Sequence, residues 1–268
     1  MSEQIVESGV APALDWAQLR GSRVLAETAD YLVLDKPVGL SVTGERHDTD
    51  LVRIAADTGE LLIPVHRIDK VTSGAVLLAR STAAHGWLTR QFAKRTVRKS
   101  YLVITRSVGL PAFTTVDLPL AVGRKNRVRI AAARAEIRYD QYDAYTGRWS
   151  VPEAAVRPGG LASVTVLRRL WQGTRHTLVA AEPHTGRRHQ IRVHLAWIGH
   201  PIVGDPLFPA ADGSVRTCLH AWRLAFDDSV GNRVLVEAVP DEPFWTPVAA
   251  ELPATAAAEL LAHAVSSV

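Results

Sequence analysis

Asp69 is an acidic residue in a short polar segment that two apolar runs enclose. The runs are residues 61–63 and 75–79, and residues that favour turns lie between them. Short apolar runs of this kind are typical of buried strands. We therefore expect Asp69 in a turn where a rigid sheet can direct its side chain into a cleft. Asp is also common in turns for local reasons, so on this segment alone a structural role, such as pairing with Arg67 or Lys70, is the simpler interpretation.

Four segments together carry a more specific signal. The segment around Asp69 reads HRIDKVTSG, and the other three are residues 34–37 (LDKP), 98–101 (RKSY) and 185–194 (TGRRHQIRVH), the last followed by GHPIVGD at 199–205. HRID-x-x-TSG resembles the catalytic signature of the RluA-type pseudouridine synthases, which usually read HRLD-x-x-TSG. The other segments match that family in its own order. The resemblance covers roughly residues 31–221.

The resemblance implies a role for each matched side chain. Asp69 corresponds to the essential catalytic carboxylate, Arg192 to the cation that keeps it ionised, and Tyr101 to an aromatic residue that lies against the uracil and assists the late removal of the C5 proton. His66 is expected to be structural. Five further residues are expected to bind the substrate, with Arg67 filling the gap left by a flipped-out nucleotide and Leu219 packing on the base: Arg67, Lys99, Arg188, Gln190 and Leu219.

The implied reaction needs little besides a carboxylate. Uridine becomes pseudouridine when the bond from base N1 to ribose C1′ breaks, the bound uracil rotates, and C5 joins C1′. This isomerisation requires no redox change, energy source or metal, and the sequence has no cofactor motif, so we expect no cofactor. Burial favours the neutral form of a carboxyl group, which is why Asp69 needs a cation such as Arg192. The sequence leaves open whether Asp69 attacks the sugar, attacks the base or removes a sugar proton.

Composition is that of a globular protein with an arginine-rich basic set. The 268 residues are 47% hydrophobic, the net charge is +4, and only five of the basic residues are lysines. Arginine binds phosphate through its planar guanidinium and stacks on bases, so an arginine-rich protein suits an RNA partner. A GC-rich genome also raises the content of arginine relative to lysine. Cys218 is the single cysteine, so the chain has no internal disulfide and no cysteine cluster for zinc. No run is long enough to cross a membrane, and we expect a cytoplasmic protein.

Strands and helices are expected to alternate irregularly along the chain. Strand patterns occur at residues 31–34, 101–104, 161–167 and 177–181, and residues 218–226 and 233–239 resemble a hairpin. Helices are expected at 49–58, at 82–92 after a Ser81 or Thr82 cap, and within 185–198. These patterns, together with the family resemblance, predict an α+β fold with a largely antiparallel mixed sheet. We expect an N-terminal extension at 1–22, a catalytic domain at 23–250 and an alanine-rich tail at 251–268, either a surface helix or frayed.

Residues 134–160 depart most from the family pattern. The stretch RYDQYDAYTGRW places tyrosines and Trp149 beside Arg138 and Arg148. These aromatic residues could stack on RNA bases, or they could anchor a loop to itself, and the sequence favours neither. The choice of RNA could therefore depend on this segment. Ile68 in place of the usual Leu is a change of similar volume and small consequence.

Two other functions compete with an RNA isomerase. A metal-dependent hydrolase could use His184, His189 and His194, but steps of five residues do not place side chains on one helix face, and no H-E-x-x-H motif is present. An inactive RNA-binding or ribosome-assembly protein is the second alternative, which the intact set of Asp69 and its partners disfavours. We expect RNA as the partner, either 23S rRNA or tRNA or both, and a monomer.

Overall fold

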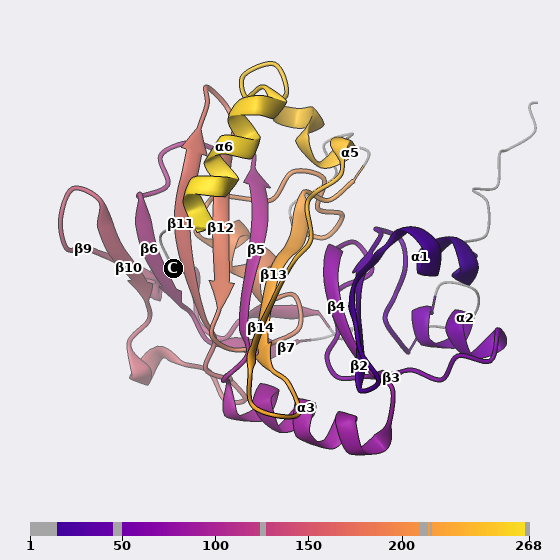
Figure 1. Ribbon diagram of the computed structural model, residues 1–268. Coiled ribbons are helices and arrows are strands. Elements are labelled where there is room, and N and C mark those ends of the chain that lie inside the picture. Colours follow the sequence, from indigo (N-terminus) through magenta and orange to yellow (C-terminus); the bar gives the residue numbers. More distant parts are fainter. Residues whose placement is uncertain (1–14, 45–49, 124–126, 209–213, 215, 266–268) are drawn as a thin grey trace, which may run out of the picture.

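The computed structural model describes residues 15–44, 50–123, 127–208, 214 and 216–265. One large sheet runs through the molecule in the order β1-β2-β4-β13-β5-β12-β11-β6-β10-β9, with β3 paired to β4 and β14 to β13 (Figure 1). Neighbouring strands are antiparallel except at β4–β13 and β6–β10. The predicted α+β fold with a largely antiparallel mixed sheet is confirmed. The strands are β1 (Val24–Glu27), β2 (Tyr31–Lys36), β3 (Ile63–Pro64), β4 (Ser73–Ala79), β5 (Arg98–Thr105), β6 (Phe113–Asp117), β9 (Arg138–Gln141), β10 (Thr146–Ser150), β11 (Val164–Gln172), β12 (Thr177–Pro183), β13 (Leu219–Asp227) and β14 (Arg233–Glu237), and β7 (Leu120–Val122) pairs separately with β8 (Val128–Ile130).

Helices cover both faces of the sheet, because strand side chains alternate between the faces. Val103 of β5 belongs to the apolar cluster under α4, whereas its neighbour Leu102 belongs to the cluster under α5 and α6. Near the N-terminus α1 and α2 pack on β2 and β4, and α3 packs against β4 and β13. The helices are α1 (Trp16–Ser22), α2 (Leu51–Asp57), α3 (Thr82–Lys94), α4 (Gln190–Trp197), α5 (Glu242–Trp245) and α6 (Ala254–Val265). None of these described helices has the length and apolar character that a membrane span requires.

The helix predicted at residues 82–92 is confirmed and extends to Lys94. The Ser81 hydroxyl accepts a hydrogen bond from the Ala84 N–H at 3.1 Å, which caps the first turn. Arg95 adopts a left-handed conformation with φ 59° and ends the helix. The chain then turns directly into β5, so the C-terminal end of α3 and the start of β5 lie together.

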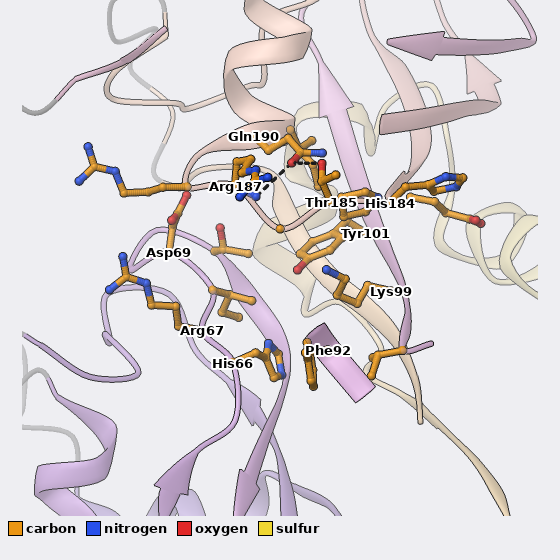
Figure 2. A pocket seen from close by; sticks show the side chains of 18 of the residues that line it. His66, Arg67, Asp69, Phe92, Lys99, Tyr101, His184, Thr185, Arg187 and Gln190 are labelled. Atoms are coloured by element: carbon orange, nitrogen blue, oxygen red, sulfur yellow. Dashed lines mark hydrogen bonds between the residues drawn. The ribbon is translucent and has the colours of Figure 1, made fainter. Parts of the chain in front are cut away.

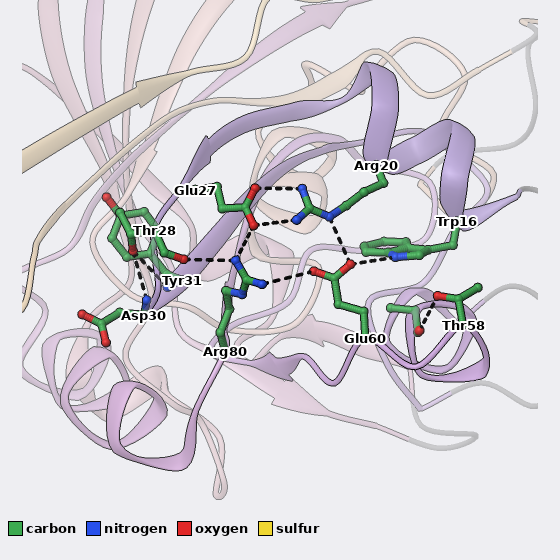
Figure 3. A network of polar contacts seen from close by, with 10 residues as sticks. Trp16, Arg20, Glu27, Thr28, Asp30, Tyr31, Thr58, Glu60 and Arg80 are labelled. Carbon is green, nitrogen blue, oxygen red and sulfur yellow. Dashed lines mark hydrogen bonds and ion pairs between the residues drawn. The ribbon is translucent and has the colours of Figure 1, made fainter.

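The N-terminal residues that showed no clear pattern include a well-packed helix. Trp16 and Leu19 of α1 are buried against β2 and α2. An ion-pair network also fastens this helix (Figure 3): Glu60 accepts hydrogen bonds from Trp16 Nε1 at 2.9 Å and Arg20 Nε at 3.0 Å, and Glu27 pairs with Arg20 and Arg80. These contacts attach α1 to the neighbouring strands and to α2. Residues 1–14 lie outside the described residues.

The alanine-rich C-terminal segment forms a helix, one of the two predicted alternatives. Ala257, Leu261 and Ala264 of α6 are buried in the cluster on the sheet face opposite α4. In Figure 1 this helix lies across β11 and β12. The segment thus covers one face of the sheet with its apolar side. Small side chains allow the helix to approach the strands closely.

The TSG part of the first motif joins two halves of the sheet. Ser73 and Gly74 of β4 pair with His220 and Ala221 of β13, and this two-residue parallel ladder is the pairing between these strands. Gly74 has φ 105°, and a Cβ at this position would lie 2.3 Å from the Ala221 carbonyl oxygen. Ser73 Oγ accepts a hydrogen bond from Arg216 Nη2 at 2.6 Å and lies 2.7 Å from His220 Nδ1. The join therefore requires glycine and is fixed by buried polar contacts.

Two histidines are buried and a third, His66, is partly buried, and the surroundings of all three favour the neutral ring. Burial lowers the pKa of His66 to about 3 and the pKa values of His194 and His220 to about 4. Each ring contacts a backbone group: His66 Nε2 accepts from the Leu77 N–H at 3.0 Å, and the Nε2 atoms of His194 and His220 lie 2.9 and 3.0 Å from backbone carbonyl oxygens. Protonation of these histidines therefore opposes folding.

We predict that Gly74→Ala lowers the free energy of unfolding by about 3 kcal/mol or prevents folding, because both the backbone conformation and the space exclude a side chain. Gly86→Ala is the matched control. Gly86 lies inside α3, where a Cβ would meet nothing closer than 3.6 Å, so this substitution should stabilise the protein by up to about 1 kcal/mol. Urea denaturation of both variants measures the difference, and equal stabilities would contradict the prediction.

We also predict that stability falls as the pH is lowered from 6.5 towards 4. In this range the unfolded histidines bind protons and the folded ones do not, so each buried histidine costs about 1 kcal/mol per pH unit. Urea denaturation at pH 7, 6 and 5 measures the slope. His220→Gln should reduce that slope by the contribution of one proton. A free energy of unfolding that does not change between pH 6.5 and 5 would show that these rings are not neutral in the folded state.

Candidate active site

A pocket with a volume of about 1110 Å³ opens where the turn before β4, the start of β5 and the loop before α4 meet. Figure 2 shows Arg67 and Asp69 on one side of it and Lys99 and Tyr101 on the other. All eight residues singled out in the sequence line this pocket, although they come from four separate segments: Arg67, Asp69, Lys99, Tyr101, Arg188, Gln190, Arg192 and Leu219.

Asp69 lies in the expected turn between β3 and β4. Its backbone carbonyl accepts a hydrogen bond from the Thr72 N–H at 2.9 Å, and the carbonyl of Lys70 accepts one from the Gly39 N–H at 2.8 Å. Ile68 beside it is buried in the cluster formed by the N-terminal strands. The Asp69 side chain is 24% exposed and faces the pocket. The backbone hydrogen bonds and the burial of Ile68 hold this turn in place, and the turn presents the Asp69 carboxylate to the pocket.

Arg192 contacts Asp69 and a second carboxylate. Its Nη1 lies 3.0 Å from Asp69 Oδ2, while Nε and Nη2 donate to the two oxygens of Asp205 at 2.7 and 2.9 Å. The Arg192 side chain is 3% exposed and that of Asp205 is 0% exposed. Burial lowers the pKa of Arg192, but the hydrogen bonds and charges of Asp205 and Asp69 outweigh this effect and leave it raised. The guanidinium therefore stays charged beside Asp69.

Tyr101, Lys99 and Leu219 share one face of the central strands. Tyr101 pairs with Ala221 and Val103 with Leu219 across β5 and β13, so these side chains point to the same side as Lys99. Burial raises the pKa of the Tyr101 phenol, and the charge of Asp69 raises it further, so the phenol is protonated at neutral pH. Burial lowers the pKa of Lys99. The pocket floor is therefore aromatic and apolar, with one amine at its edge.

Gln190 lines the pocket, but its side-chain amide is hydrogen-bonded to other residues of the protein. Its Oε1 accepts from the Thr185 hydroxyl at 2.7 Å and from the Arg187 N–H at 3.1 Å. Its Nε2 donates to the Val164 carbonyl at 2.9 Å and to the Thr165 hydroxyl at 3.0 Å. These bonds hold the loop at 185–189 against β11. The contacts favour a supporting role for Gln190 over direct contact with a ligand.

Five arginines surround the mouth of the pocket. They come from the turn that carries Asp69, from the segment that joins α3 to β5, and from the loop before α4: Arg67, Arg95, Arg98, Arg187 and Arg188. All except Arg188 are exposed. Guanidinium groups bind phosphate in a planar, often bidentate manner. A rim of this kind matches a polyanion that reaches across the pocket.

Two residues near the Asp69–Arg192 pair were given no role in the isomerase site from the sequence. Asp205 lies in the last matched segment, but nothing in the pattern indicated that it would clamp Arg192. His189 Nε2 lies 3.8 Å from Asp69 Oδ1, and its backbone has φ 57°, a left-handed conformation that is uncommon for a residue other than glycine. Burial lowers its pKa, with the neighbouring charges of Asp69 and Arg192 acting in opposite directions. In the sequence, the position of His189 in the matched segment HQIR, residues 189–192, was the indication that it belongs to the site.

The histidines proposed for a metal site do not come together as ligands. His184 is exposed at the pocket rim, whereas His194 is buried between Thr165 and the Leu118 carbonyl. Across the described ranges no group of three or more His, Cys, Asp or Glu side chains is arranged to hold a metal ion. The donor set of this pocket therefore does not support the metal-dependent hydrolase.

Comparison with known proteins identifies the family. A family model described as RNA pseudouridylate synthase matches residues 30–197. Ribosomal large subunit pseudouridine synthase D of Nitrosomonas europaea is 31% identical over 82% of this chain, which spans 62% of that relative's length. tRNA pseudouridine synthase C of Pasteurella multocida is 31% identical over 76% of this chain and 84% of its own. Human RNA Pseudouridylate Synthase Domain Containing 4 has the same fold, with a TM-score of 0.68 and 23% identity over 87% of this chain and 93% of its own. The chain therefore belongs to the RNA pseudouridylate synthase family.

Proposed function

We propose that this protein isomerises uridine to pseudouridine in structured RNA, with Asp69 as its catalytic carboxylate. The observation that supports this most directly is the pair of Asp69 and Arg192, 3.0 Å apart inside an arginine-rimmed pocket. Family membership supplies the reaction class. The pocket supplies what that reaction needs, namely one ionised carboxylate, a fixed cation and an aromatic wall.

The reaction conserves all atoms of the nucleotide. The N1–C1′ bond breaks, the uracil turns within the pocket, C5 bonds to C1′, C5 loses its proton and N1 gains one. Asp69 lies where it can act on the sugar or the base, and Arg192 keeps its charge through the process because Asp205 fixes the guanidinium. Since no electron leaves the substrate, the chain's own side chains are sufficient, and we propose that no cofactor takes part.

A flipped-out nucleotide fits the shape and polarity of the pocket. Tyr101 and Leu219 offer flat and apolar surfaces on which a base can stack. The Tyr101 phenol carries its proton, so it can accept the C5 proton while it donates its own proton to a carbonyl oxygen of the base. Exposed Arg67 lies next to the Asp69 turn, where it can occupy the space that the nucleotide leaves in the RNA. The other arginines of the rim, together with Lys99, can bind flanking phosphates.

The printed names of the relatives include synthases of the large ribosomal subunit and of tRNA. We propose 23S rRNA or tRNA, or both, as the substrate of this chain, and the cytoplasm as its location because these RNAs are made and used there. We also propose a monomer, since the large apolar clusters lie inside the described fold. An inactive RNA-binding or assembly protein is the alternative, and the intact set of Asp69, Arg192 and Tyr101 argues against it.

Asp69→Ala should abolish pseudouridine formation and leave RNA affinity within a few fold, because phosphate contacts dominate binding. Carbodiimide mapping of total RNA, from cells with and without the gene, identifies the modified uridine. Wild type and Asp57→Ala, a control at the exposed end of α2, should restore that site, and Asp69→Ala should not. Modification by Asp69→Ala would exclude Asp69 as the catalytic group. A deletion that removes no site would favour the binding or assembly protein.

Arg192→Lys should reduce kcat by roughly a hundredfold or more, because one ammonium cannot serve both carboxylates in the way that the guanidinium fork does. Single-turnover and steady-state kinetics at saturating RNA measure this loss of kcat. Lysine is chosen because alanine would leave buried Asp205 without a counter-charge and endanger folding. Arg188→Lys serves as the control and should weaken RNA binding while kcat stays within a few fold of the wild type. An unchanged kcat in Arg192→Lys, with only affinity reduced, would make Arg192 a substrate contact.

A further inference from the structure

A second, smaller pocket lies beside the segment that departs from the family pattern. Its volume is about 330 Å³, which is within the range of small-molecule sites. The ends of β6 and β10, the segments that follow these strands and the loop before β11 form its walls: Asp117, Pro119, Arg148, Ser150, Val151, Glu153, Val156, Gly160 and Ala162. Most of these residues belong to or border the region 134–160, for which the sequence supplied no motif. The fold alone does not explain why this surface is hollow.

The two pockets are neighbours across one arginine. Arg187 lines the catalytic pocket, and its Nε donates to the Ala162 carbonyl oxygen at 3.4 Å. Ala162 lines the second pocket. Arg187 therefore links the lining of the two pockets. An RNA strand that places one nucleotide against Asp69 can place a nearby nucleotide in the second pocket.

The charge of the second pocket differs from that of the catalytic rim. Asp117 and Glu153 contribute two carboxylates, against the single guanidinium of Arg148. Arg148 is already paired with Asp117. A phosphate group would meet net negative charge here, whereas the N–H edge of a base would meet hydrogen-bond acceptors. The rim arginines thus suit the RNA backbone, and this pocket suits a base.

The walls of the pocket also suit a flat ring. Pro119, Val151 and Val156 present apolar surface, and Arg148 presents a guanidinium whose ion pair with Asp117 fixes its position. Planar guanidinium groups and apolar side chains are common stacking partners of unpaired bases. A Cβ at Gly160 would lie 2.7 Å from Val156, so the close packing of these two wall residues requires glycine.

We propose that this second pocket binds the base of an unpaired nucleotide close to the target uridine and favours bases with an exocyclic amino group. The inference rests on the proposed function, since it names part of the substrate. Carboxylates only accept hydrogen bonds, and adenine, cytosine and guanine offer amino donors that uracil lacks. Uracil offers a single N3–H donor between two carbonyl oxygens, and the carboxylates of Glu153 and Asp117 would repel these oxygens. The pocket therefore contributes to the choice of RNA site.

Changes at exposed Glu153 test the chemistry without disturbing the core. RNA hairpins carrying the mapped uridine, with each flanking unpaired position changed in turn to A, C, G and U, are compared by kcat/KM in the carbodiimide assay. The wild type should prefer amino-bearing bases over uracil at one flanking position by about tenfold. Glu153→Gln should reduce this preference to about twofold, because an amide both donates and accepts. Glu153→Lys should reverse it, because an ammonium only donates.

Glu259→Lys is the matched control, because it makes the same charge change on the exposed side of α6, outside both pockets. It should keep the wild-type preference. Equal wild-type rates for all four bases at every flanking position would overturn the second pocket as a base site, and so would an unchanged preference in both Glu153 variants. A wild-type protein that modifies no uridine would instead overturn the proposed function and this inference together.

Discussion

The guanidinium of Arg192, buried between Asp69 and Asp205, is the interaction on which the site depends. A single carboxylate beside a guanidinium would leave the cation free to rotate toward solvent or ligand. Asp205 removes that freedom because it occupies Nε and Nη2 from one side and is itself fully buried. The remaining Nη1 is directed at Asp69. The ion pair at Asp69 is therefore oriented by a second ion pair that is buried away from the pocket.

Three different elements bring these side chains together. Asp69 projects from a turn whose backbone is hydrogen-bonded to Thr72, Arg192 projects from α4, and β5 lies between them with Tyr101. Each element also packs into an apolar cluster, so the positions of these three side chains follow from core packing. The exposed arginines lie at the rim of the pocket, where their long side chains can adjust to a flexible ligand. Rigidity at the carboxylate and adaptability at the mouth are thus separated in space.

Local pattern in the sequence was sufficient for the parts of the fold that depend on near neighbours. The turn at Asp69, the strands around it and the helix after Ser81 follow from alternation, caps and short apolar runs. Family resemblance placed Arg192 near Asp69, which periodicity alone could not do. The sequence did not indicate the clamp by Asp205 or the left-handed backbone of His189, because these depend on contacts between distant segments. It also missed α1, whose two buried residues are too few for a clear period.

The two-residue ladder between β4 and β13 forms a seam between the segments that carry Asp69 and Arg192. Asp69 belongs to the part of the sheet that ends at this seam, whereas Tyr101 and Arg192 belong to the part beyond it. Asp69 and Arg192 thus face each other across a ladder of two residue pairs. An apolar cluster spans the same seam, because Leu77 of β4 and Phe226 of β13 both belong to it. The distance between Asp69 and Arg192 therefore depends on side-chain packing across the seam more than on strand hydrogen bonds.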